Sequence, residues 1–363
     1  MNRNGRPARV VSPGQILTQE LESRDWTQRD LAAIMGRPYQ AVNEIINGNK
    51  QITPDTAREL AYAFGTSIDF WMALEANYRL HLAEQNEKEQ EIQKRSQLYS
   101  AAPIREMIKR GWIKGSDNVT TLEGQVLSFF RVSNLSNALS KPASLRASQS
   151  RDVEVASQSA WVQRVENIAQ EQKIGDFSRE RLQQAIPSLL ELTSDVESIS
   201  KVPEVLMRLG VHFVLLPHLP KTYLDGAAIS TNNNPIVGIT LRYDRIDSFW
   251  FTLMHELAHI VSGHSGIILD DTEQRIGSAN QAEEDEANRM ATEWLVDQQV
   301  LSKFIREVRP YFSKPAIEDV SVRLHRHPGI VLGQLQRQKV VEYKHLRALL
   351  VKTRPYLEKW EYN

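Results

Sequence analysis

The sequence predicts a multidomain protein with an all-α N-terminal domain, a helical middle region and an α+β C-terminal domain. Residues 13–80 hold a run of short helix patterns separated by glycine and proline. Residues 81–200 keep a mostly helical composition. Beyond residue 200, β-rich segments come first and apolar helices follow, which is the order of an α+β domain. We therefore expect domains at residues 1–80, 81–200 and 201–363.

The overall composition limits the class of protein. The 363 residues are 41% hydrophobic and 25% charged, which is typical of a globular chain, and the net charge of -1 favours neither a nucleic-acid coat nor a membrane-surface binder. Cysteine is absent, so a metal site needs histidine and carboxylate ligands. We see no signal-peptide pattern and no apolar stretch of about 18 residues, and we expect a cytoplasmic protein without membrane contact.

The N-terminal helices have clear start and stop signals. Thr27 precedes Asp30 by three residues, close to a capping box, and Gly36 ends that helix. Pro38 suits the first turn of a third helix that runs to Asn47. Two more helices follow before residue 80.

The middle region begins with a polar connector. Residues 81–99 are rich in Glu, Gln and Lys and contain no Gly or Pro, which predicts a solvated helical connector. Residues 103–200 look mostly helical and carry no motif that indicates chemistry.

The C-terminal domain is expected to alternate strands and helices. Residues 211–216 are a short β-rich run, and residues 236–243 alternate like a strand. A long apolar helix with two histidines then ends at Gly263.

This helix carries His255-Glu256-Leu257-Ala258-His259. Residues four apart project from one helix face, so His255 and His259 are able to share one zinc ion. Glu256 lies about 100° round the helix, beside the metal, where it can take a proton from the attacking water and pass it to the departing amine. The motif alone leaves open a helix with two incidental histidines.

A third ligand is available on a second helix. Residues 283–288 open an apolar-spaced helix with several carboxylates, and a third ligand on a second helix, with water in the fourth position, is the open arrangement of His2Glu zinc enzymes. Glu284-x-x-Ala287-Asn288 resembles the Glu-x-x-Ala-Asp/Asn segment of gluzincin peptidases. The resemblance implies that Glu284 ligates zinc and that Asn288 orients a ligand histidine. Glu283 and Glu286 remain alternatives. His264 does not fit the third-ligand pattern of metzincins.

The C-terminal half also resembles the ImmA/IrrE family of bacterial metallo-endopeptidases. The similar segments are residues 219–228, 242–251 and 327–331, and the resemblance spans about residues 200–340. It implies a zincin-like metallopeptidase fold, and family members whose targets are understood cleave repressor proteins. His327 or His325 is a candidate to hydrogen-bond the oxyanion of the tetrahedral intermediate; the alternative is a surface turn with two solvated histidines.

Residues 13–80 resemble the helix-turn-helix of the HigA-like and phage-repressor families, with a recognition helix at residues 37–47. In this class, exposed side chains at the start of the recognition helix reach base edges and others contact phosphates. The candidate DNA-binding residues are Gln28, Arg37, Tyr39, Gln40, Asn43 and Lys50. Residues 1–80 contain nine Lys/Arg and nine Asp/Glu, so the segment is not basic, and a protein-interaction module is the alternative.

Three interpretations of the whole chain follow. We expect a homodimeric transcription regulator that binds double-stranded operator DNA and carries a Zn²⁺-dependent endopeptidase acting on a repressor or toxin partner. The substrate is expected to pair as an added strand along residues 236–241, in preference to cleavage of the chain's own connector at residues 81–99. The alternatives are an antitoxin-like regulator whose peptidase-like domain only senses or interacts, and a peptidase whose helix-turn-helix docks a protein.

Overall fold

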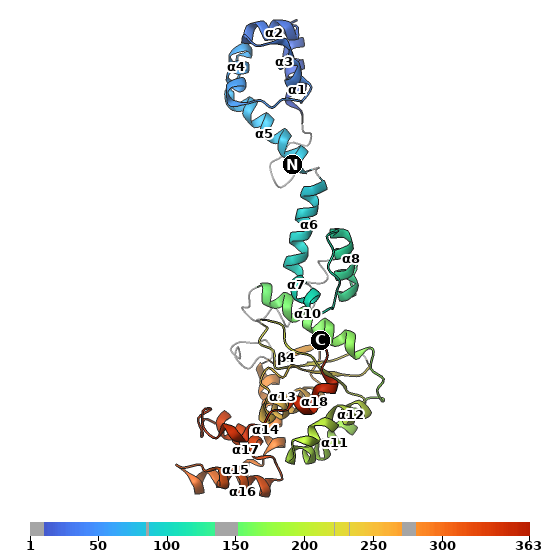
Figure 1. The fold of residues 1–363 in the computed structure, drawn as a ribbon, viewed down its shortest axis with the longest axis vertical. Helices are drawn as coiled ribbons and strands as arrows, with labels where there is room; N and C mark the ends of the chain where they lie inside the picture. Colours follow the sequence, from blue (N-terminus) through green and yellow to red (C-terminus); the bar gives the residue numbers. More distant parts are fainter. Residues whose placement is uncertain (1–10, 85–86, 135–151, 221, 232, 271–280) are drawn as a thin grey trace. The chain divides into compact units, whose positions relative to one another are not determined.

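The computed structural model describes residues 11–84, 87–134, 152–220, 222–231, 233–270 and 281–363 (Figure 1). The chain divides into two compact units, Met1–Ser96 and Gln97–Asn363, which we describe separately. The first unit is helical, and the second combines helices with one four-stranded sheet. The expected multidomain fold class is confirmed. Among the described residues, no helix is long and apolar enough to cross a membrane.

The first unit contains α1 Pro13–Glu22, α2 Gln28–Met35, α3 Tyr39–Ile46, α4 Pro54–Phe64 and α5 Ile68–Glu84. The capping box predicted at the start of α2 is present, because Thr27 and Asp30 each accept a hydrogen bond from the other's backbone N–H. Gly36 ends α2 in the left-handed conformation, with φ +64°. The helices pack around a small core in which Leu31 and Trp71 are fully buried.

Helices continue through the connector and the middle region. The connector is helical over its described residues, in α5 and in α6 Glu87–Ala101. The elements that follow are α7 Ile104–Lys109, α8 Val119–Phe130, α10 Asp152–Ala169, α11 Arg179–Glu191 and α12 Val202–Arg208. Most of the middle region therefore belongs to the second unit, and it covers the sheet of that unit.

The sheet is mixed and has the strand order β1-β3-β2-β4. Its strands are β1 His212–Leu215, β2 Gly226–Ile229, β3 Ile236–Ile239 and β4 Ile267–Asp270. β1 runs parallel to β3, and β2 is antiparallel to both β3 and β4. The segment predicted as a strand to residue 243 ends earlier, because the backbone turns at Leu241, whose φ is +50°. β3 has neighbours on both edges, so the expectation that a substrate pairs along residues 236–241 is wrong.

The two faces of the sheet pack against different helices, since successive strand residues point to opposite faces. Val214 joins the core that α10 closes with Trp161. Its neighbour Phe213 joins the core on the other face, with Leu257 of α13 Ile246–Ser262. Helices therefore cover both faces of the sheet, and α13 lies on the face opposite α10.

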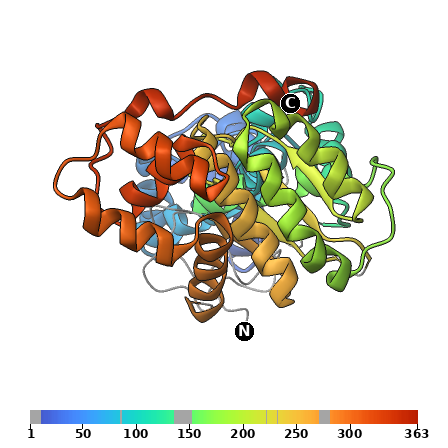
Figure 2. The same cartoon turned by 90° about the horizontal axis from the view of Figure 1, so that it is seen from below.

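The remaining helices surround α13. They are α14 Gln281–Leu295, α15 Gln298–Val308, α16 Lys314–Leu324, α17 Pro328–Arg337 and α18 Arg354–Leu357. α14, α17 and α11 each pack against α13, and Figure 2 shows α14 beside it. Because the sheet and these helices enclose it, α13 is buried on nearly every side, which fits its apolar sequence.

Candidate metal centre

The polar side chains of α13 lie in this enclosed environment. His255 and Glu256 are fully buried, and His259 is 1% exposed. A buried polar or charged side chain is costly unless it has partners, so these three residues need a compensating interaction. The helix ends as predicted at Gly263, whose φ is +76°.

Glu284 of α14 completes a three-residue cluster with the two histidines. His255 Nε2 lies 3.1 Å from His259 Nε2, and the Glu284 carboxylate lies 3.3 Å from the first and 3.5 Å from the second. Two ligands bonded at 2.0–2.1 Å to a tetrahedral zinc ion are about 3.3–3.4 Å apart. The three donor atoms therefore have the spacing and the chemistry of a His2Glu zinc site.

The protonation state of His259 suits a metal ligand. Burial is the largest of the effects that lower the pKa of His259 to about 3; His255 and His264 also lower this pKa, and Glu284 opposes the shift. The imidazole is therefore neutral at pH 7, which is the form that binds metal.

The other acidic candidates are placed differently. The Glu286 carboxylate lies 3.5 Å from His264 Nε2 and 3.4 Å from Ser262 Oγ. Within the described residues, the cluster able to hold a metal includes Glu284 and neither Glu283 nor Glu286.

Asn288 does not make the orienting bond that the gluzincin resemblance implies. Its Oδ1 is buried on α14, and His255 Nδ1 is buried on α13, and neither atom has a hydrogen-bond partner among the described residues. Among the described residues, no side chain therefore orients His255 through its Nδ1.

Gly226 of β2 packs directly against the Glu256 side chain, a contact that no pattern in the sequence indicates. A Cβ at Gly226 would lie 2.7 Å from Glu256 Oε1 and 2.6 Å from Thr252 Cγ2. A side chain at this position would have to displace the end of Glu256 and of Thr252. The backbone of β2 thus forms one wall beside the Glu256 carboxylate.

His327 is not brought to the metal centre. Its Nδ1 accepts a hydrogen bond from Gly329 N–H at 3.0 Å, so the side chain caps the start of α17. Gly329 packs against Ile246, nine residues before His255, or about 13 Å along α13. The expected oxyanion role gives way to helix capping. His325 ends α16 in the left-handed conformation and lies near the turn that leads to α17.

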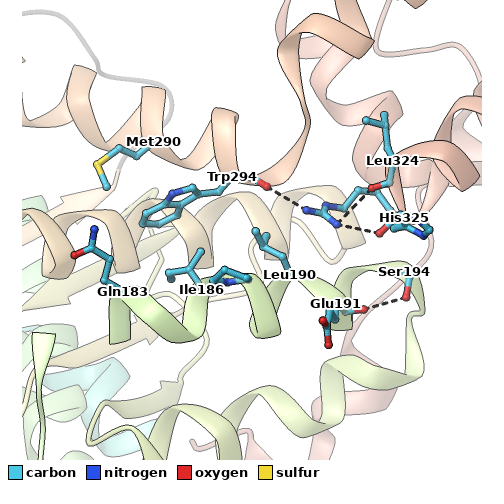
Figure 3. A pocket seen from close by; sticks show the side chains of 11 residues that line it. Gln183, Ile186, Leu190, Glu191, Ser194, Met290, Trp294, Leu324 and His325 are labelled. Carbon is cyan, nitrogen blue, oxygen red and sulfur yellow. Dashed lines mark hydrogen bonds between the residues drawn. The ribbon is translucent and has the colours of Figure 1, made fainter. Parts of the chain in front are cut away.

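His325 lines a separate cavity of about 790 Å³ between α11, α14 and that turn (Figure 3). Ile186, Leu190 and Trp294 give it apolar walls. Arg326 at its end donates hydrogen bonds to backbone carbonyls, including that of Leu295 at 2.8 Å. None of the residues of the metal cluster lines this cavity, although α14 borders both.

The candidate DNA-binding side chains lie on the first unit, mostly around α3. Tyr39, Gln40 and Lys50 are exposed, and Gln28 and Asn43 are partly exposed. Gln40 donates a hydrogen bond to Glu44 at 3.2 Å, and Asn43 accepts one from Asn47 at 3.0 Å. These polar groups pair within one helical turn.

Arg37 is engaged within the first unit. Its guanidinium makes two hydrogen bonds to the Glu59 carboxylate of α4, at 2.5 and 3.2 Å. This bidentate pair ties the turn before α3 to α4, so the structure gives Arg37 an internal partner.

Comparison with known proteins finds a family match in each of the two units. Residues 17–71 match the helix-turn-helix family, and residues 207–318 match the IrrE N-terminal-like domain of the peptidase M78 family. The HTH-type transcriptional regulator YbaQ of Escherichia coli K12 is 37% identical over 82 residues, which are 22% of this chain and 73% of YbaQ. The chain belongs to the helix-turn-helix regulators and carries an IrrE-like domain.

Solved antidote proteins are similar to part of the chain. A HigA-family addiction module antidote from Coxiella burnetii is 36% identical and covers 23% of this chain and 90% of its own, with a TM-score of 0.22. Pseudomonas aeruginosa antitoxin HigA, solved with the higBA promoter, is 34% identical with the same coverage and TM-score. The IrrE-like match contains the whole metal cluster and ends before His327.

Proposed function

We propose that this chain is a DNA-binding transcriptional regulator whose IrrE-like domain is a zinc-dependent endopeptidase that cleaves a regulatory partner protein. The observation that carries the proposal is the convergence of the buried His255 and His259 with the partly buried Glu284; Glu256, beside them, is also buried. A domain that only senses or interacts has no chemical need for a buried Glu256 carboxylate at this position.

The mechanism assigns each residue one task. His255, His259 and Glu284 hold the metal, which when bound acts as a Lewis acid on a peptide carbonyl and makes water nucleophilic at neutral pH. Glu256 accepts the proton of the attacking water on its carboxylate and returns it to the departing amine. Peptide and water thereby become a carboxylate and an amine.

We assign β4 as the docking edge for the peptide substrate. β4 is the outermost strand on its side of the described sheet, and its Asp270 pairs with Gly226 of β2, which touches Glu256. An extended peptide that paired with β4 on the side away from β2 would run past the metal cluster and gain main-chain hydrogen bonds. This edge replaces the buried strand β3 as the expected site of pairing.

The described part of the connector favours a partner over the chain itself as substrate. α5 and α6 hold residues 81–84 and 87–99 in helices, whereas a strand-adding groove needs an extended segment. Cleavage within residues 81–99 would require at least local unwinding of a helix.

The test uses the full chain with a co-encoded partner. Purified wild type should contain about one zinc per chain, and His255→Ala or His259→Ala should remove it. Glu256→Gln should keep the zinc and slow cleavage of the partner about 10²–10⁴-fold, which mass spectrometry of the products measures. Metal-free wild type, under conditions that load other zinc enzymes, would contradict the proposal. A chain fragment ending between residues 80 and 102 would instead identify cleavage in cis.

A further inference from the structure

The residue after the helix-ending glycine folds back onto the metal-bearing helix. Gly263 takes the left-handed conformation, and the Arg179 guanidinium packs so closely on it that a Cβ would lie 2.7 Å away. His264 N–H then donates to the His259 carbonyl at 3.1 Å, and the His264 carbonyl accepts from Ser230 Oγ at 2.9 Å. The backbone of His264 is thus fixed from both sides, one turn beyond His259.

The His264 side chain continues this contact to the ligand itself. His264 Nδ1 lies 2.8 Å from His259 Nδ1, the ring nitrogen that faces away from the metal cluster. The other nitrogen of His264, Nε2, lies 3.5 Å from the Glu286 carboxylate, to which Ser262 Oγ donates from 3.4 Å. The His264 side chain is 10% exposed, whereas Glu286 is 46% exposed.

Metal binding at His259 fixes the direction of the hydrogen bond between the two rings. A neutral His259 that offers its Nε2 lone pair to a metal must carry its proton on Nδ1. That proton can only be donated to a lone pair on His264 Nδ1. A neutral His264 then carries its own proton on Nε2, which faces the negatively charged Glu286 carboxylate at 3.5 Å. One set of tautomers satisfies every nitrogen of the two rings.

We propose that His264 and Glu286 are positioning residues that fix the tautomer and ring orientation of the metal ligand His259. The assignment rests on the metal centre of the proposed function and adds a role to two residues outside the ligand set. Partners that hold the second nitrogen of a ligand histidine typically contribute 10- to 100-fold in metal affinity. His255 offers an internal contrast, because its Nδ1 has no hydrogen-bond partner among the described residues.

The experiment measures the zinc dissociation constant of the full chain by competition with a chelating indicator. His264→Leu removes the acceptor for His259 and should weaken zinc binding about 10- to 100-fold. His264→Asn keeps an acceptor oxygen near the position of Nδ1 and should recover most of the affinity. Glu286→Gln keeps an acceptor but removes the charge, so it should weaken binding less than His264→Leu. His345→Leu changes an exposed histidine elsewhere and should change nothing.

A second readout reports the tautomers directly. Nitrogen-15 NMR of histidine side chains in the zinc-loaded chain should show His259 protonated at Nδ1 and His264 at Nε2. Ligation at Nε2 alone puts the proton of His259 on Nδ1, so the informative state is that of His264, which a purely structural role would not require. Circular dichroism of the metal-free variants separates loss of affinity from loss of fold, and the more exposed Glu286→Gln serves if His264→Leu does not fold.

Two results overturn the proposal in distinguishable ways. A wild type that binds no zinc removes the metal centre and the positioning role together. A zinc-binding wild type whose affinity is unchanged in folded His264→Leu removes only the positioning role, as does His264→Asn when it binds as weakly as His264→Leu. None of these measurements depends on proteolysis, so an inactive zinc-loaded chain would contradict the endopeptidase alone.

Discussion

The helix α3, which we propose as the recognition helix, and α13, which carries two of the proposed metal ligands, hold their polar side chains in opposite ways. On α3, Gln40 and Asn43 lie at the surface and bond to neighbours one turn away. On α13, His255 and His259 are buried and meet Glu284 from another helix. A surface site is completed by its ligand, whereas a buried site is already ordered by the fold. Substitutions on α3 should therefore change DNA binding, whereas substitutions around α13 should change activity by altering the packing of the site.

Gly226→Ala offers the largest test of packing control. The new Cβ would overlap Glu256 Oε1 and Thr252 Cγ2, so the carboxylate must move while the metal ligands stay. A displacement of about 1 Å can cost roughly 100-fold in rate. We expect a loss of cleavage of that size with zinc content unchanged, measured by product mass spectrometry and metal analysis.

Gly124→Ala in α8 is the matched control. A Cβ there meets no atom within 4 Å, so cleavage should be unaffected, and the helix should gain about 0.5–1 kcal/mol of stability. Equal cleavage by Gly226→Ala and wild type would show that the site tolerates movement, which would end the contrast with α3.

Substitutions on α3 should act only when DNA is present. Gln40→Ala or Asn43→Ala should relax base preference by about 1–3 kcal/mol at one position per half-site, because each amide can pair with an adenine. Selection from random DNA sequences measures this preference for the wild type and each variant. A wild type that selects no sequence would instead make the first unit a protein-interaction module.

His327 tests capping at the start of α17. Burial lowers the pKa of His327 and nearby Asp195 partly opposes the shift, so the folded chain favours the neutral ring whose Nδ1 accepts from Gly329. With the folded pKa below 6.5, its contribution to stability is present above pH 6.5 and is lost as the pH falls below that value. An N-cap contributes about 0.5–2 kcal/mol.

The measurement is the free energy of unfolding of the metal-free chain in urea at pH 7 and pH 5. Between pH 7 and pH 5, wild type should lose more free energy of unfolding than His327→Asn. The asparagine side chain does not titrate, so it caps the helix equally at both pH values. Equal losses of stability in the two proteins would show that His327 is not a pH-dependent N-cap.

Substitution of Arg37 should have the smallest effect on stability, and it tests whether this side chain contacts DNA. Its pair with Glu59 is partly exposed, so Arg37→Ala should lower stability by about 0.2–1 kcal/mol. Because Glu59 already engages the guanidinium, the salt dependence of DNA binding should stay unchanged, whereas Lys50→Ala should reduce its slope by about one. An equal reduction in Arg37→Ala would mean that the ion pair opens on DNA.

The sequence was informative where spacing along one element determines geometry. His255 and His259 are four apart on a helix, and Thr27 and Asp30 form a local box, so both arrangements follow from helix periodicity. Gly263 was expected to end α13 and does so. The strand at β3 was found, although its end at Leu241 depends on a backbone turn that composition does not signal.

Features that depend on distant segments were missed. β2 and β4 are four residues each and gave no strand pattern, so the Gly226 contact with Glu256 was invisible. The sequence does not reveal that His327 Nδ1 accepts a hydrogen bond from Gly329 N–H, which caps α17. His264 was considered only as a metal ligand. Its position directly after a helix-ending glycine is the signal that could have suggested a contact with His259.

The strand order also has a consequence for how the second unit folds. The β2–β3 pairing joins Ile229 to Ile236 across a short turn, whereas the β2–β4 pairing joins Gly226 to Asp270, 44 residues apart (270 minus 226), with α13 between them. Closing the longer loop costs more chain entropy, and long-range pairings generally slow folding. We therefore expect β4 to dock after the hairpin and α13 have formed. In kinetic terms, the edge beside Glu256 would be the last part of the site to assemble during refolding.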